Sequence, residues 1–133
     1  MRELTRRVPP RKVAQLIWLG NMARKVLITL YGNEVAPRFD LATEVLIATL
    51  GPDGRVEEEK TVVLPQASAE NLCHMVLTEE IQAVICGAIE EEYHQYLTWK
   101  RVNVFDSVMG SLEAVLERLE EGTLRSGDIL FGK

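Results

Sequence analysis

The feature that most constrains the fold is a β-branched and leucine-rich run, Val26 to Leu30, which stops at Tyr31 and Gly32. Such a run, of strand length and bounded by glycine, is typical of a strand buried on both faces at the centre of an α/β sheet. The loop that follows, up to Asp40, leaves the carboxyl end of this strand, where α/β sheets usually bind ligands. We therefore expect the other elements to be arranged around this strand and its loop.

Length and composition are those of one soluble globular domain. The chain has 133 residues, enough for a single hydrophobic core, and it is 47% hydrophobic and 26% charged. No apolar stretch is long enough to span a bilayer, and we expect no secretory signal at the amino terminus. Cys73 and Cys86 form no CxxC pair and suit a reducing compartment. We expect a cytoplasmic protein with no membrane contact.

The charge is unevenly distributed. Residues 1–25 hold seven Lys or Arg and one acid, Glu3, so the rest of the chain must carry −11 to give the net charge of −5. An acidic body argues against broad nucleic-acid binding, because phosphates need a basic surface. The basic segment is interpreted mainly as a solvated leader that lies on the acidic body of its own or a neighbouring chain.

The elements can be followed in order along the chain. After Pro9 and Pro10 we expect a short amphipathic helix to about Leu19, which could cover the sheet or dock a second subunit. Strands are predicted at 26–30, 44–50, 55–64, 82–86 and 102–105, and helices beginning near Ser68, Glu90 and Ser111, the last ending at Gly122. The turn Gly51–Gly54 joins the second and third strands into a hairpin. The charged residues 57–60 predict that the third strand is an exposed sheet edge.

Right-handed crossovers then lead to one topology, an α/β fold with helices on both faces of the sheet. The five strands are expected in the order 3-2-1-4-5, with strand 2 antiparallel. This divides the chain into an extension with a short helix (1–25), an α/β domain (26–122) and a tail without assignment (123–133). The first, fourth and fifth strands then deliver three loops to one crevice.

These loops carry the candidate ligand-binding residues. Arg38 and Asp40 flank Phe39; if Phe39 enters the core, they can hold an anion, or they can form a local ion pair that orders the loop. Cys86 ends the fourth strand and is a candidate metal ligand, although buried cysteine often acts as a small hydrophobe. Asp106 could instead cap the following helix. The full predicted set is Asn33, Arg38, Phe39, Asp40, Gly87, Ala88, Asp106 and Ser107 for a ligand and Cys86 for a metal.

The chain lacks the catalytic residues that several enzyme classes need. A ribonuclease-H-type nuclease needs converging carboxylates for divalent metal, and the first strand carries no acid. The GxSxG elbow of serine hydrolases and the glycine fingerprints of phosphate or dinucleotide loops are absent. We therefore expect a protein that is not an enzyme.

Three motifs resemble one known family. The first-strand loop VAPRFD, the strand–glycine turn VICGAI and the last strand leading through a glycine into a helix are similar to the dinitrogenase iron–molybdenum cofactor biosynthesis family, which includes NifX-like carriers and the carboxyl-terminal domain of the NifB type. The resemblance covers roughly Val26 to Gly122. It implies a ribonuclease-H-like three-layer fold and the binding or transfer of iron–sulfur or molybdenum-containing clusters.

The chain departs from the family pattern in two loops. Arg38 stands where the family commonly has a histidine, and arginine offers no lone pair to a metal, although it can bind an anion. Gly87-Ala88-Ile89-Glu90 stands where the family usually has glycine-glycine-isoleucine-glycine. The resemblance implies a non-enzymatic carrier of an anionic or metal–sulfur ligand. The alternative is an interaction or regulatory module that kept the fold without the cluster, with a protein partner or a second copy docked through the amino-terminal helix.

Overall fold

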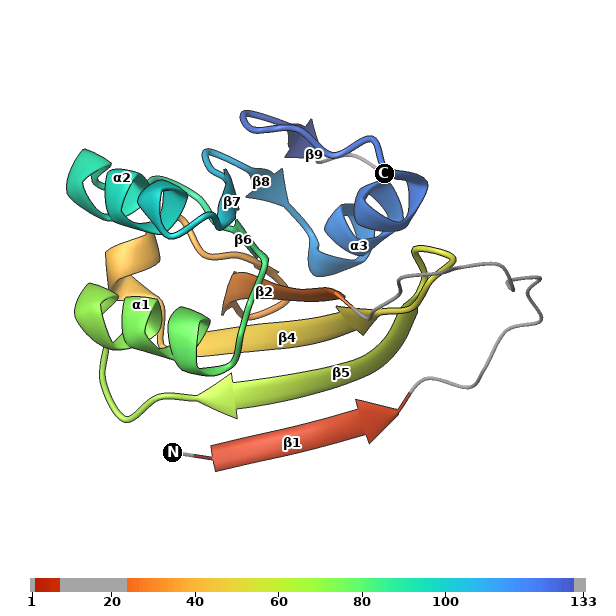
Figure 1. Cartoon of the computed structure of the whole chain (residues 1–133), viewed down its shortest axis with the longest axis horizontal. Coiled ribbons are helices and arrows are strands. Elements are labelled where there is room, and N and C mark those ends of the chain that lie inside the picture. Colours follow the sequence, from red (N-terminus) through yellow and green to blue (C-terminus); the bar gives the residue numbers. More distant parts are fainter. Residues whose placement is uncertain (1, 8–23, 131–133) are drawn as a thin grey trace.

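A mixed β-sheet forms the centre of the computed structural model, which describes residues 2–7 and 24–130 (Figure 1). Its longest strands are β2 (Arg24–Tyr31), β4 (Glu44–Leu50) and β5 (Val56–Val63). The other strands of this sheet are β1 (Arg2–Arg7), β3 (Glu34–Val35), β6 (Ala83–Ile85) and β7 (Asn103–Phe105). The helices are α1 (Ala69–Thr78), α2 (Glu91–Trp99), α3 (Leu112–Glu121) and the short 3-10 helix η2 (Phe39–Leu41).

The predicted strand order is confirmed. The strands lie in the order β1-β5-β4-β2-β6-β7, and the five from β5 to β7 reproduce the order 3-2-1-4-5. β4 runs antiparallel to both β2 and β5, whereas β2, β6 and β7 are parallel to one another. The carboxyl ends of these three parallel strands therefore meet at one edge of the sheet.

The prediction that the charged third strand forms an exposed edge is wrong. β1 pairs antiparallel with β5 along its length, from Arg2 opposite Val63 to Arg7 opposite Glu58. In this register Arg6 pairs with Glu59 and Arg7 with Glu58 of the acidic stretch. β1 therefore covers this edge of the sheet. The amino-terminal helix predicted up to Leu19 falls outside the described residues.

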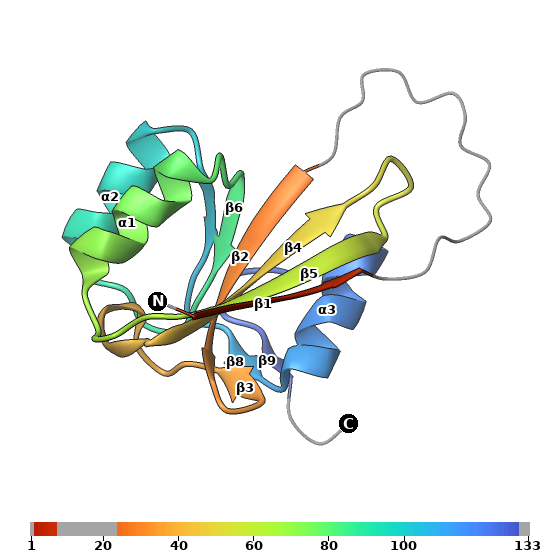
Figure 2. The ribbon, with the colours of Figure 1, turned by 90° about the horizontal axis from the view of Figure 1, so that it is seen from below.

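Helices cover both faces of the sheet, as predicted: α1 and α2 lie on one face and α3 on the other (Figure 2). Alternate residues of β2 serve the two cores, because strand side chains point to opposite faces in turn. Leu27 belongs to the core under α1 and α2, and Ile28 to the core under α3. No helix in the described part of the chain is long and apolar enough to cross a membrane.

The helix ends follow the local sequence signals. The Ser68 hydroxyl accepts a hydrogen bond from the backbone N–H of Asn71 at 3.1 Å, and Ser111 does the same for Ala114 at 3.1 Å. Gly122 ends α3 in the left-handed conformation, with φ of 76°. Ser111, and not Asp106, is the residue that caps α3.

The tail beyond Gly122 also has a defined path. β9 (Ile129–Leu130) pairs in parallel with β8 (Met109–Gly110), forming a second, two-stranded sheet. Leu124 and Leu130 are buried in the core under α3. The tail is therefore packed beside the loop that follows β7.

Candidate functional site

The loops after β2, β6 and β7 are joined to one another by backbone hydrogen bonds. The Ala88 N–H donates to the Pro37 carbonyl at 2.8 Å, and the Phe39 N–H donates to the Ala88 carbonyl at 2.8 Å. On the other side, the Ser107 N–H donates to the Gly87 carbonyl at 2.8 Å. The β6 loop therefore lies between the other two and holds them together at one end of the sheet. We call this arrangement the three-loop end.

Close approach of these loops depends on Gly87. A Cβ atom at this position would lie 2.5 Å from the Ala36 carbonyl oxygen and closer still to that of Pro37. Real Cβ atoms do not come this near to backbone oxygens. Gly87 is therefore required because the main chains of the two loops pack too closely for a side chain. Its position after a strand does not by itself reveal this role.

Arg38, Phe39 and Asp40 take the alternating positions expected of them. The Phe39 side chain is fully buried and its ring centre lies 6.3 Å from that of Tyr93 on α2. The Arg38 side chain is half exposed. Its guanidinium makes a bidentate ion pair with the Asp40 carboxylate, with Nε donating to Oδ1 at 3.0 Å and Nη2 donating to Oδ2 at 2.8 Å. This pairing raises the pKa of the Arg38 guanidinium above its usual value. Of the two predicted alternatives, the structure shows the local ion pair. This ion pair fixes the plane of the guanidinium, and with it the direction of the N–H groups that do not bind Asp40.

Asp106 and Ser107 form the third part of the site. The Ser107 hydroxyl donates to Asp106 Oδ2 at 3.0 Å, and Ser107 has a φ of 59°, uncommon for a residue other than glycine. Asp106 Oδ1 lies 3.7 Å from His94 Nε2 on α2. The Asp106 N–H donates to the Ser126 hydroxyl at 3.1 Å, which ties the loop to the tail.

Two of these contacts were not anticipated from the sequence. His94 is not among the predicted site residues, and Ser126 lies in the tail without assignment (123–133). Each contacts Asp106 across a long sequence separation, and no local pattern marks either pairing.

Asn33 and Cys86 are placed differently from the rest of the predicted set. The Asn33 carbonyl accepts a hydrogen bond from the Leu112 N–H at 2.7 Å, which holds its main chain against the start of α3. Cys86 is fully buried. Burial, and secondarily the charge of Asp106, raises the pKa of the Cys86 thiol to about 12. In this conformation the thiol is a protonated core group, and its role as a metal ligand stays a prediction.

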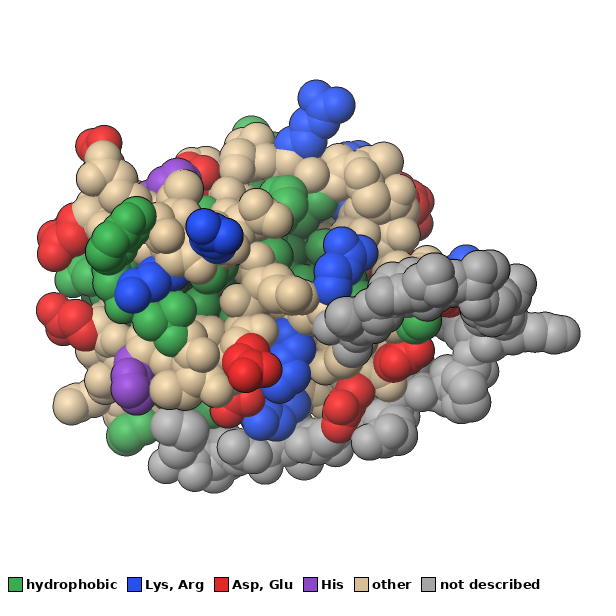
Figure 3. Space-filling model, in the orientation of Figure 1, with side chains coloured by type: hydrophobic (Ala, Val, Ile, Leu, Met, Phe, Trp, Pro, Cys, Tyr) green, Lys and Arg blue, Asp and Glu red, His purple; other side chains and the backbone are tan. Residues whose placement is uncertain are grey.

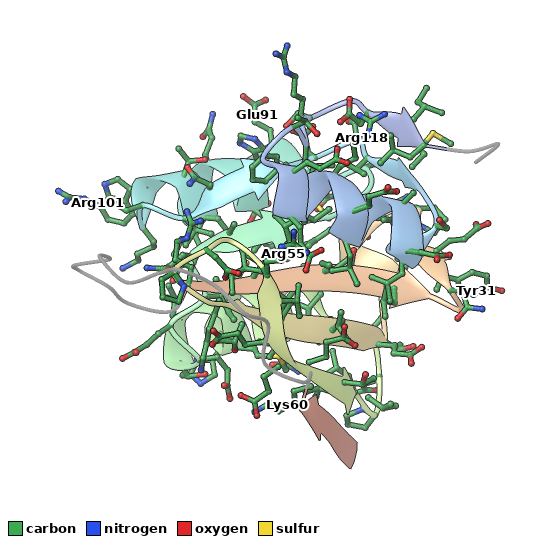
Figure 4. The ribbon with its side chains drawn as sticks, turned by 90° about the vertical axis from the view of Figure 1, so that its right-hand side faces the viewer. Tyr31, Arg55, Lys60, Glu91, Arg101 and Arg118 are labelled. Atoms are coloured by element: carbon green, nitrogen blue, oxygen red, sulfur yellow. The ribbon has the colours of Figure 1, made fainter. Side chains whose placement is uncertain are left out.

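A mainly apolar hollow of about 300 Å³ adjoins Arg38. Its wall includes Leu30, Tyr31, Pro37 and Leu41, and Arg38 supplies a positive charge. Tyr31 and Leu41 are 75% and 62% exposed, and Tyr31 extends from the end of β2 (Figure 4). The hollow can therefore receive a ligand with an anionic group for Arg38 and a less polar surface for its wall.

The described residues offer no ready-made metal centre. Nowhere in 24–130 do three or more His, Cys, Asp or Glu side chains come together in a way that could hold a metal ion. Arg38 occupies the exposed position of the first loop, and Cys86 is buried below it. These residues do not fit direct coordination of a metal, whereas they fit charge and hydrogen bonding to an anion.

A model of the dinitrogenase iron–molybdenum cofactor family matches residues 22–122. The chain belongs to this family. The match includes all three loops and every predicted ligand-binding residue. No curated protein matches the chain significantly in sequence.

Solved structures support the family fold. The crystal structure of PH0822 is similar with a TM-score of 0.69 and 16% identity, covering 77% of this chain and 93% of that one. A Methanocaldococcus jannaschii protein described as a "putative dinitrogenase" is similar in its crystal structure, with a TM-score of 0.64 and 21% identity over 78% of this chain and 94% of its own. Its NMR structure gives 0.65, with 20% identity over 80% of this chain and 94% of its own. At these identities the likeness establishes the fold alone.

Proposed function

We propose that this protein is a non-enzymatic carrier that binds an anionic ligand of the metal–sulfur cluster class at the three-loop end. Two findings support the proposal: the chain belongs to a family named for the iron–molybdenum cofactor, and the loops after β2, β6 and β7 meet beside an exposed guanidinium. The meeting of the three loops beside Arg38 carries the argument, because it would provide a binding place for the cluster that the family is named for.

Charge and hydrogen bonding hold the ligand in this proposal. Asp40 uses two of the five N–H donors of Arg38, so three stay available for an anion. The apolar hollow beside Arg38 contacts the less polar surface of the ligand. Because the described side chains do not form a coordination set, the cluster keeps its own ligands and is bound from outside.

The predicted residues divide into two groups in this proposal. Arg38, Ala88 and Ser107 are exposed and contact the ligand, whereas Phe39, Asp40 and Gly87 hold the loops in position. Asp106 orients the Ser107 hydroxyl. Asn33 is exposed at the turn between β2 and β3 and would contact only a large ligand.

Anaerobic loading tests the proposal. The full chain is incubated with isolated iron–molybdenum cofactor, which is a preformed cluster, then freed of unbound material by gel filtration and examined by visible absorption. We expect a retained chromophore in the wild-type protein. Arg38→Gln should reduce retention roughly tenfold or more, because it removes the positive charge and the charged donors that would hold the anion. Arg55→Gln, on the exposed β4–β5 turn, is the matched control and should retain the chromophore.

Further outcomes separate the modes of binding. Cys86→Ser should leave the chromophore unchanged if the ligand is held from outside. Loss of the chromophore in this variant, with the fold intact by circular dichroism, would assign the thiol as a ligand instead. Absence of any chromophore in the wild-type chain, or equal retention by Arg38→Gln and Arg55→Gln, would contradict the proposal.

A second candidate function is protein–protein interaction. It is favoured by the exposure of Tyr31 and Leu41 beside the three-loop end, since large apolar side chains are usually exposed together only where something binds them. Light scattering on the wild type and on Tyr31→Ser/Leu41→Ser tests it. Loss of an oligomer in the double variant would support this function, and an unchanged monomer in both would remove self-association. Deleting residues 1–24 is a poor test, because it would also remove β1 and uncover the edge of β5.

A further inference from the structure

A second hollow lies between α1 and α2 and shares no residue with the three-loop end. Its volume is about 430 Å³. From α1 it is lined by Glu70, His74 and Leu77, and from α2 by Glu92, Tyr93 and Tyr96. Hydrophobic side chains gather over this pair of helices, with acidic, basic and histidine side chains around them (Figure 3).

The aromatic wall is held in place from below. Tyr93 is half-buried and packs against Phe39, which is itself fully buried in the core under α1 and α2. Tyr96 is 37% exposed, and Lys100 Nζ already lies 5.7 Å from the centre of its ring. Tyrosine faces attract cations through the negative face of the ring, so this wall suits a positively charged group.

The charge of the hollow has the matching sign. Glu70 and Glu92 stand on opposite sides, one on each helix, and both are exposed. Burial raises the pKa of Tyr93, and the neighbouring charges of Glu70, Glu92 and Glu90 raise it further, because each carboxylate disfavours the phenolate. An anionic ligand would be repelled from both sides.

We propose that this hollow binds a small organic cation, an alkylammonium whose charged end lies near Glu70 and Glu92. Its alkyl body would contact Leu77, Tyr93 and Tyr96. An inorganic metal ion fits less well, because no group of three or more metal-ligating side chains in the described ranges could hold one. The volume is in the range of small-molecule sites in general. This site is independent of the proposed carrier function.

Nuclear magnetic resonance titration of the full chain with n-hexylammonium tests the site. Saturable shifts are expected for the backbone amides of residues 70–77 and 92–96, with a dissociation constant in the millimolar range. The neutral analogue 1-hexanol should bind roughly tenfold more weakly, because it keeps the alkyl contacts and loses the charge.

Charge-matched variants decide whether the carboxylates are responsible. Glu70→Gln/Glu92→Gln should weaken n-hexylammonium binding roughly tenfold, since both carboxylates that would face the ammonium lose their charge. Glu113→Gln/Glu117→Gln makes the same charge change on the exposed face of α3 and should leave the affinity unchanged.

Three results would overturn the inference. They are the absence of saturable shifts at these amides, equal affinity for n-hexylammonium and 1-hexanol, and equal affinity of the two double variants. Zinc chloride is titrated as a separate arm, and zinc-induced shifts at the same amides without any response to n-hexylammonium would replace the proposed ligand with a metal.

Discussion

Replacement of Gly87 by alanine is the most direct test of how the three-loop end is built. The added methyl group would point into the Ala36 and Pro37 carbonyl oxygens, which belong to a backbone that cannot move as a flexible side chain does. The β2 loop would have to separate from the β6 loop. Two backbone hydrogen bonds join these loops, from Ala88 N–H to Pro37 and from Phe39 N–H to the Ala88 carbonyl, both 2.8 Å.

The expected loss of stability follows from these contacts. Overpacking in a close-packed region costs about 1–3 kcal/mol. Each weakened backbone hydrogen bond adds about 0.5–1.5 kcal/mol. Because partial movement of the loop relieves the clash while it stretches the bonds, the two contributions do not add fully, and we expect a loss of about 2–4 kcal/mol. For a chain of this length that lowers the Tm by roughly 7–15 °C.

Urea unfolding followed by circular dichroism measures this loss, and Gly51→Ala is the matched control. The three atoms nearest to a Cβ at Gly51 would all belong to the side chain of Glu57, whose far end can turn away. Gly51→Ala should therefore lower the free energy of unfolding clearly less than Gly87→Ala does. If Gly87→Ala were as stable as Gly51→Ala, the loops would not be in the close contact described, and the argument for a joined three-loop end would fail.

Three further predictions concern the core and a helix end. Thr29 is fully buried, and its hydroxyl has no hydrogen-bond partner among the described residues, so Thr29→Val should stabilise the protein by about 1–2 kcal/mol in urea unfolding; a loss of stability would mean that the hydroxyl is satisfied. Burial raises the pKa of Cys73 to about 11 and that of Cys86 to about 12. The thiols ionise at lower pH in the unfolded chain than in the folded protein. The stability that comes from keeping them protonated is therefore complete below about pH 9 and is lost as the pH rises toward 11–12. Cys86→Ala should lose less stability over that window than the wild type, and an equal loss would contradict the shift. Ser111→Ala removes the cap of α3 and should cost about 1 kcal/mol in the same assay, a prediction that an unchanged midpoint would refute.

Local signals in the sequence determined most of the elements. The run Val26–Leu30 became the central strand, because its side chains suit burial on both faces. Ser68 and Gly122 marked helix ends through bonds and dihedral angles that involve only neighbouring residues. The strand order then followed from the handedness of the crossovers, which the chain's chirality sets.

Tertiary structure decided what lies at the end of those strands. Whether Arg38 faces a ligand or binds Asp40, and whether Cys86 is accessible or buried, depends on how far the loops close over the sheet. The pairing of β1 with β5 and the contacts of Asp106 with His94 and Ser126 join segments distant in the chain. Such pairings depend on register and packing in three dimensions, and a short window of sequence does not contain that information.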